Sequence, residues 1–210
     1  MRKLLIFLFF LLLTTTGWSQ KKAVTEEGNQ IILYDNGTWK YVKDRDSSKS
    51  LSTNPIPIRK PATATFLLKS TKFEGIGIWL DPKQWQFKKG ENNEDAEFEM
   101  QLKGQDLYAM VISEKIEIPI ESLQEIALEN ASKVAPDITI VKEEYRMVNN
   151  LKVLFMQMDG TAKGIKISFC GYYFSNDKGT IQLVIYTAQN LLANYTKQVE
   201  ELLAGLTTFK

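Results

Sequence analysis

The fold follows from residues 138–187, which read ITIVKEEYRMVNNLKVLFMQMDGTAKGIKISFCGYYFSNDKGTIQLVIYT. Four runs in this stretch are rich in β-branched and aromatic residues, and turn residues separate them. The runs predict strands over residues 138–147, 151–159, 165–174 and 180–187. Connections this short join antiparallel neighbours, because parallel neighbours need a crossover of a dozen or more residues. We therefore expect an antiparallel meander at the centre of the fold.

The segments on either side of this meander add further strands and two helices. Shorter strands are predicted over residues 66–69, 76–80, 96–102 and 107–112. After Pro119 the apolar residues recur at steps of three and four, which predicts an amphipathic helix from Ile120 to Val134. A second amphipathic helix is expected over residues 191–206. Two such helices must cover a sheet, so the predicted class is α+β, an antiparallel sheet with helices packed on it.

The first 19 residues have the pattern of a signal peptide. Arg2 and Lys3 precede an apolar run from Leu4 to Leu13, which is about 15 Å long as a helix and too short to span a bilayer. Gly17 and Ser19 are the small residues expected before a cleavage site. We predict an exported protein, periplasmic or extracellular, with no stable membrane insertion after cleavage.

Three parts are expected in the exported chain: a small β-meander over residues 20–42, a flexible linker over 43–64, and a main domain over 65–210. The turn at residues 35–37, Asp-Asn-Gly, is a strong hairpin signal inside the meander. The linker is charged and Ser-rich, and it holds half of the prolines of the chain, which is why we expect it to stay flexible.

Composition argues against several classes of function. The 210 residues contain no histidine, which excludes Ser-His-Asp and Cys-His catalysis and the usual zinc sites. Lys and Arg total 26 against 25 Asp and Glu, so the excess of positive charge that nucleic-acid binding needs is missing. The single cysteine, Cys170, is expected to be a buried free thiol. We predict no catalytic residue, no metal ligand and no cofactor.

Three segments together resemble the Mog1/PsbP-like domains. They are GIWLDPKQW at residues 77–85, the hairpin from YYF at 172–174 through DKG at 177–179 to IQLVIY at 181–186, and LLAGLTTF at 202–209. The resemblance covers residues 66–210 and implies an antiparallel sheet between helices, together with accessory or partner-binding work without catalysis. The N-terminal meander resembles a DGTW-type repeat found in bacterial exported proteins, which favours a bacterial envelope as the setting.

The aromatic residues are the strongest functional signal, because exposed aromatic side chains often mark binding surfaces. The candidate surface comprises Trp39, Tyr41, Trp79, Trp85, Tyr172 and Tyr173. Three hypotheses stay open: a non-catalytic accessory protein that binds a protein partner of unknown identity, an envelope module that binds a glycan or apolar small molecule, and a hydrolase that uses carboxylates. A concave aromatic pocket favours the second, whereas a flat aromatic patch favours the first.

Overall fold

The computed structural model describes residues 21–25, 30–33, 39–41, 51–91, 93 and 95–209. The chain divides into two compact units, residues 1–46 and 47–210. The expected signal peptide, residues 1–19, lies outside the described residues. Among the helices that are described, none combines the length and the apolar character needed to cross a membrane.

The first unit contains a small antiparallel sheet. Its strands β1 (Lys21–Val24), β2 (Gln30–Leu33) and β3 (Trp39–Tyr41) follow one another in the order of a meander. Ile31 of the central strand lies opposite Ala23 on one side and Tyr41 on the other. The resemblance of this segment to the DGTW-type repeat stays a prediction.

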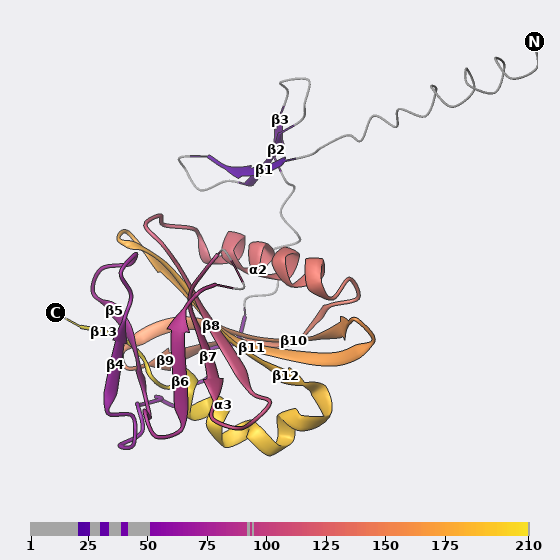
Figure 1. The fold of residues 1–210 in the computed structure, drawn as a ribbon. Helices are drawn as coiled ribbons and strands as arrows, with labels where there is room; N and C mark the ends of the chain where they lie inside the picture. Colours follow the sequence, from indigo (N-terminus) through magenta and orange to yellow (C-terminus); the bar gives the residue numbers. More distant parts are fainter. Residues whose placement is uncertain are drawn as a thin grey trace, which may run out of the picture. The chain divides into compact units, whose positions relative to one another are not determined.

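The second unit is built on an antiparallel seven-stranded sheet (Figure 1). In order across the sheet the strands are β6 (Trp85–Lys89), β7 (Ala96–Leu102), β8 (Tyr108–Glu114), β12 (Gly179–Ala188), β11 (Ile165–Asn176), β10 (Leu151–Ala162) and β9 (Thr139–Val148). The predicted meander forms four of the seven strands of this sheet, and these four lie side by side in sequence order. Strand β6 was not predicted from the sequence.

One face of the large sheet is closed by a second sheet and a helix. The second sheet has the order β13 (Leu206–Thr208), β5 (Ile76–Leu80) and β4 (Phe66–Lys69), and the helix is α3 (Thr196–Leu203). A single hydrophobic core joins these elements to the large sheet; it includes Ile78, Leu202, Phe155, Tyr172 and Leu183, all buried. We call this side the closed face.

The opposite face carries α2 (Ile120–Val134), which has the bounds predicted from its apolar spacing (Figure 1). Leu123 and Ala127 of this helix are buried in a second core with Met156, Phe169 and Tyr173 from β10 and β11. A helix is about 10 Å wide, whereas seven strands spaced about 4.8 Å apart span about 29 Å. One helix therefore covers only part of this side, which we call the half-covered face.

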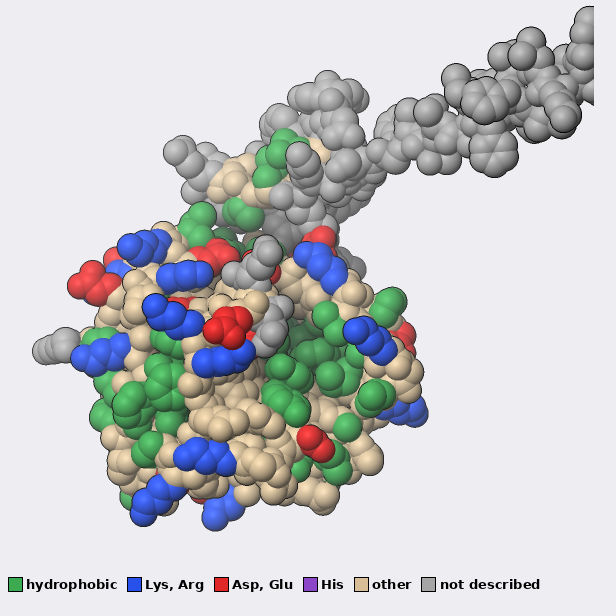
Figure 2. Space-filling model, viewed as in Figure 1, with side chains coloured by type: hydrophobic (Ala, Val, Ile, Leu, Met, Phe, Trp, Pro, Cys, Tyr) green, Lys and Arg blue, Asp and Glu red, His purple; other side chains and the backbone are tan. Residues whose placement is uncertain are grey.

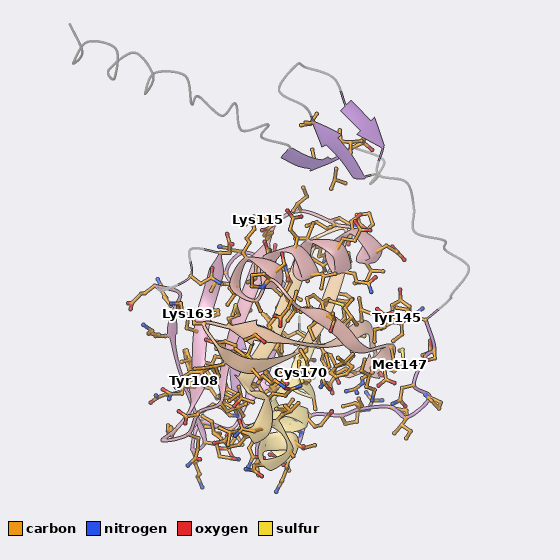
Figure 3. All side chains as sticks on the ribbon, turned by 90° about the vertical axis from the view of Figure 1, so that its right-hand side faces the viewer. Tyr108, Lys115, Tyr145, Met147, Lys163 and Cys170 are labelled. Carbon is orange, nitrogen blue, oxygen red and sulfur yellow. The ribbon has the colours of Figure 1, made fainter. Side chains whose placement is uncertain are left out.

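The prediction of a flexible linker over residues 43–64 is wrong for residues 52–58, and its first part, residues 43–50, lies outside the described residues. This segment lies along the outer edge of β9, with parallel bridges from Thr53 to Tyr145 and from Ile58 to Val148. The amide of Ile58 donates to the carbonyl of Met147 at 2.8 Å. Figure 3 shows Tyr145 and Met147 at this edge. The prolines are compatible with this role because the segment lies at an edge, where proline's missing N–H costs no ladder hydrogen bond.

The predicted C-terminal helix over residues 191–206 is shorter than expected. Its first part is a 3₁₀ helix (Gln189–Tyr195), α3 ends at Leu203, and Leu206 begins β13. Gly205 explains the change: the amide of Trp79 donates to its carbonyl at 2.8 Å, and a Cβ there would lie 1.9 Å from the carbonyl oxygen of Trp79. The chain leaves the helix because it must pass this close to β5.

Candidate functional site

A groove of about 710 Å³ lies on the half-covered face, in the part that α2 leaves open. Figure 2 shows it as a hollow lined by hydrophobic side chains. Its walls come from five strands, the β6–β7 connection and the last residue of α2; the lining residues are Gln86, Phe87, Lys88, Asn93, Glu99, Met100, Gln101, Tyr108, Met110, Val134, Ile167, Phe169 and Tyr186. We refer to this cavity as the aromatic groove.

Strand alternation places the aromatic side chains in the groove. Tyr108 on β8 lies opposite Tyr186 on β12, and their rings are stacked with centroids 5.6 Å apart. Tyr186 in turn lies opposite Phe169 on β11, at 6.0 Å between ring centroids. Three neighbouring strands thus present a continuous row of rings. Such a row offers apolar contact area, and two of its three rings carry a polar hydroxyl group.

Polar side chains form the rim at β6 and β7. Lys88 lies 3.4 Å from the carboxylate of Glu99, which also accepts a hydrogen bond from the amide of Asn93 at 3.1 Å. Beside them the amide nitrogen of Gln86 donates to Gln101 at 3.0 Å. The rim therefore offers amide groups and one ion pair around an apolar floor.

The two tyrosine hydroxyls of the groove are neutral around pH 7. Burial, followed by the negative charge of Asp106, raises the pKa of Tyr108 above its ordinary value. Burial likewise raises the pKa of Tyr186, and the nearby charge of Glu99 adds to the effect. Both groups can therefore donate and accept hydrogen bonds, but neither acts as a base at neutral pH.

A second cavity of about 240 Å³ continues the groove beneath α2. The two cavities share Asn93, Met110, Val134 and Phe169 among their lining residues. The side chain of Asn93 donates to the sulfur of Met110 at 3.5 Å, at the boundary between them. Methionine is flexible and fits irregular apolar shapes, so Met110 is suited to a wall between two adjoining cavities.

The structure does not gather the predicted aromatic surface into one site. Trp85, Tyr172 and Tyr173 are buried, at 4%, 0% and 1% exposure, so they belong to the cores and not to an exposed surface. Tyr172 and Tyr173 do point to opposite sides of the sheet, as predicted, but each side is covered there. Half-buried Trp79 lies under the ammonium of Lys60, 4.8 Å from the ring centroid.

The other two predicted residues, Trp39 and Tyr41, belong to β3, and their side chains are outside the described part of the structure. Their role as a docking face stays a prediction.

The thiol of Cys170 is free and buried, as predicted. Burial raises its pKa to about 12, so it is protonated at neutral pH. Among the described residues, no three side chains of the Asp, Glu, Cys or His type are placed to share a metal ion. Of the described carboxylates, Glu99 is the one that lines the aromatic groove and Asp95 the one that lines the cavity under α2.

The residues of the groove were missed at the level of sequence. Tyr108 and Tyr186 lie within predicted strands but were not singled out, and Phe87 lies in the unpredicted strand β6. Alternation within β12 was the available signal: Leu183 and Ile185 point to one side, whereas Val184 and Tyr186 point to the other.

Comparison with solved structures identifies the fold. The solution structure of cyanobacterial PsbP (CyanoP) from Synechocystis is similar with a TM-score of 0.52 and 11% identity, over 71% of this chain and 95% of that chain. The chain has the PsbP-like fold. LpqN, involved in cell envelope biogenesis of Mycobacterium tuberculosis, is similar with a TM-score of 0.44 and 9% identity, over 64% of this chain and 83% of that chain. No protein-family profile and no curated protein matches the sequence.

This comparison supports the predicted resemblance to PsbP-like domains at the level of the fold. Identity this low carries no binding residue from one chain to the other, so the function has to be argued from the groove itself.

Proposed function

We propose that this chain is an exported, non-catalytic binding protein of the bacterial envelope, and that its aromatic groove binds a small amphipathic molecule. The observation that carries the proposal is a concave cavity of about 710 Å³ with Tyr108, Phe169 and Tyr186 along its floor. Cavities of about 300–1,000 Å³ with mostly apolar walls and a few polar groups are typical of small-molecule sites. The concave shape favours the hypothesis of a small ligand over that of a protein partner.

The chemistry of the groove describes the ligand. Its floor is apolar and aromatic, so the ligand needs a flat or flexible apolar body that displaces water from the rings. The rim offers the amides of Gln86 and Gln101 and the neutral hydroxyls of the tyrosines, so the ligand also carries uncharged hydrogen-bonding groups.

The non-catalytic part of the proposal rests on the state of the reactive groups. The Cys170 thiol is buried and protonated. In the groove, the carboxylate of Glu99 already accepts hydrogen bonds from the amides of Glu91 and Asn93, and Lys88 lies within 3.4 Å of it. These groups hold the rim together, and a sequence without histidine offers no imidazole to assist them.

A titration with the neutral apolar dye N-phenylnaphthylamine tests the proposal. We expect saturable binding to the folded chain near one dye per protein, with a rise in fluorescence. Ile167→Lys places a charge in the groove and should weaken binding at least tenfold. Ile165→Lys is the matched control, because Ile165 is on the same strand, two residues away, 62% exposed and outside the groove lining.

Equal binding by Ile167→Lys and Ile165→Lys would contradict the groove as the site. Near-ultraviolet circular dichroism of both variants must match the native spectrum, since partly unfolded chains bind such dyes without a specific site.

A segment of a protein partner is the second candidate occupant. Phe87 on β6 lines the groove, and its ring lies 5.3 Å from that of Phe66 on β4; the two residues are 40% and 41% exposed. Phe66 does not line the groove, so Phe66→Ser should leave dye binding unchanged. If a protein partner is captured, this substitution should weaken its binding.

A further inference from the structure

A third cavity, of about 580 Å³, lies at another end of the main domain and is lined mostly by polar and charged side chains. It is lined by Lys69, Ser70, Thr71, Lys72, Glu74, Gly75, Lys115, Lys178 and Phe209. The four lysines come from three separate places in the chain: Lys69 ends β4 and Lys72 lies in the turn after it, Lys115 follows β8, and Lys178 lies in the β11–β12 turn. Figure 2 shows Lys and Arg side chains, with some acidic ones between them, over the loops at this end. We call this cavity the lysine pocket.

The pocket is rich in positive charge, whereas the domain as a whole has a net negative charge. Residues 65–210 carry 16 basic and 20 acidic side chains, whereas the pocket is lined by four lysines and one glutamate. All four lysines are exposed, and within the described part of the chain none of them lies within 4 Å of a carboxylate. Among the described residues, no ion pair therefore neutralises their charges.

Hydrogen bonds to the buried carboxylate of Glu97 hold the residues that form one wall of the pocket. Glu97 accepts hydrogen bonds from the hydroxyl of Ser70 at 2.7 Å and from the amide and hydroxyl of Thr71 at 2.5 and 2.7 Å. The Ser70 hydroxyl also accepts a hydrogen bond from the amide of Phe73 at 2.9 Å, and Phe73 is buried. The turn that carries Lys69 and Lys72 is thus held in one conformation before any ligand binds.

The C-terminal segment closes another side of the pocket. The amide of Phe209 donates to the carbonyl of Gly75 at 2.8 Å, and the ammonium of Lys69 lies 4.7 Å from the centre of the Phe209 ring. Gly75 has φ +79°, which places it in the region that glycine adopts most easily. The aromatic ring therefore positions one of the four positive charges at the pocket.

We propose that the lysine pocket binds a multiply charged oxyanion, a molecule that carries phosphate or sulfate groups. Lysine ammonium groups are compact point charges, and a phosphate group carries a charge of about −1.5 to −2 at pH 7. A cavity of about 580 Å³ is wide enough for several such groups, so four lysines around it match a polyanion better than a single small ion. This site is separate from the aromatic groove and does not depend on the function proposed for it.

Calorimetric titration of the full exported chain with sodium tripolyphosphate tests the inference. We expect binding in 50 mM salt that weakens at least tenfold in 200 mM salt, because ion pairing at the pocket displaces counterions. Joint replacement of Lys69, Lys72, Lys115 and Lys178 by Gln should weaken binding at least tenfold. The control replaces four exposed lysines outside the pocket by Gln, namely Lys83, Lys152, Lys163 and Lys166, and should retain binding within about twofold.

Sedimentation of the chain with phosphatidylglycerol vesicles separates a lipid surface from a soluble ligand. Vesicle binding that requires the pocket lysines, without tripolyphosphate binding, would assign the anion to a lipid headgroup. Tripolyphosphate binding without vesicle binding would assign it to a soluble molecule, and either result supports the pocket. Equal losses in the pocket set and the control set, or no binding to either probe, would overturn it. The neutral dye of the groove experiment does not respond to these substitutions if the two sites are separate.

Discussion

The two faces of the seven-stranded sheet differ in how completely they are covered. The closed face is buried under the β13–β5–β4 sheet and α3, and its apolar residues form one continuous core. Within the described part of the chain, α2 is the helix that covers the half-covered face (Figure 1), and beside it lies the aromatic groove. Both faces are made by alternate residues of the same strands. Stability and binding are thus divided between the two sides of one sheet.

The reactivity of the Cys170 thiol reports how well the closed face excludes solvent. We expect the largest difference between folded and unfolded protein for this group. Because burial raises its pKa from 9.0 to about 12, the fraction of thiolate at pH 8 is about 1,000-fold lower than in the unfolded chain. Native protein should react with a thiol reagent about 1,000-fold more slowly than protein in denaturing urea. Comparable rates in the two states would show that this face is open to solvent.

Matched isoleucines compare the packing of the two faces directly. Ile185 on β12 is buried on the closed face, whereas Ile167 on β11 is half-buried in the groove. Ile185→Ala should lower the free energy of unfolding by about 3–4 kcal/mol, since a fully packed site leaves a cavity. Ile167→Ala should lower the free energy of unfolding by about 1 kcal/mol, because the side chain of Ile167 is already partly in contact with water.

Urea unfolding of both variants gives these values. Equal losses would mean that the groove is as tightly packed as the core and would contradict the distinction between the faces.

Arg146 is a polar connection within the closed face. Its guanidinium donates to Glu144 at 2.7 Å and to Glu200 at 3.1 Å, and it lies 3.7 Å from the centre of the Phe155 ring. Arg146→Met keeps apolar volume but leaves Glu144 with only the exposed Lys142, 3.6 Å away, as a counter-charge, so we expect a loss of about 2 kcal/mol at pH 7. Lys197→Met removes an exposed ion pair with Glu201 and should cost less than about 0.5 kcal/mol.

Acid should reduce the effect of Arg146→Met. Burial raises the pKa of the Glu144 carboxyl, but the hydrogen bond and charge of Arg146 outweigh it and hold the pKa below its ordinary value. A lowered folded-state pKa contributes stability above the unfolded value of about 4.3, and this contribution disappears as pH falls through the folded value. Unfolding at pH 7 and pH 3 should show a smaller difference between native chain and variant at pH 3. An unchanged difference would exclude ion pairing as the cause.

We expect a small effect on stability for a substitution in the segment along β9. Ile58→Pro removes the amide that donates to Met147 and should cost about 1 kcal/mol. Ile56→Pro is the control, because the amide of Ile56 bonds only to the side chain of Asn54 and not to β9. Hydrogen exchange of the Met147 and Asn149 region should accelerate in Ile58→Pro and not in the control. Identical exchange in both variants would mean that residues 51–58 do not protect this edge.

Most of the fold follows from local patterns in the sequence. The helix between Pro119 and Pro136 and strands β4, β5 and β7 have the predicted bounds. The errors involve contacts between distant segments. Residues 51–58 look like a linker because their composition is polar and Pro-rich, yet they add to the edge of β9, about 90 residues later in the chain. Leu206 continues the helical pattern, but pairing with Ile78 places it in a strand.

The aromatic character of the candidate site could be predicted from the sequence, but its location could not. The sequence indicates that aromatic residues matter and that alternate residues of β12 point to opposite sides. It does not indicate how much of each side the helices cover, which decides whether Tyr172 and Tyr186 are core or surface. Tyr172 lies in the core of the closed face, whereas Tyr186 is only partly buried and lines the groove beside α2. How much of each sheet face is covered depends on the packing of the whole domain, so local sequence patterns do not predict it.

Chemical-shift mapping with N-phenylnaphthylamine on the ¹⁵N-labelled chain tests the division between the faces most directly. We expect shifts confined to the half-covered face, centred on Tyr108, Phe169 and Tyr186, with residues of the closed face such as Leu206 unchanged. Shifts centred on the closed face, or no saturable shifts at all, would contradict this division.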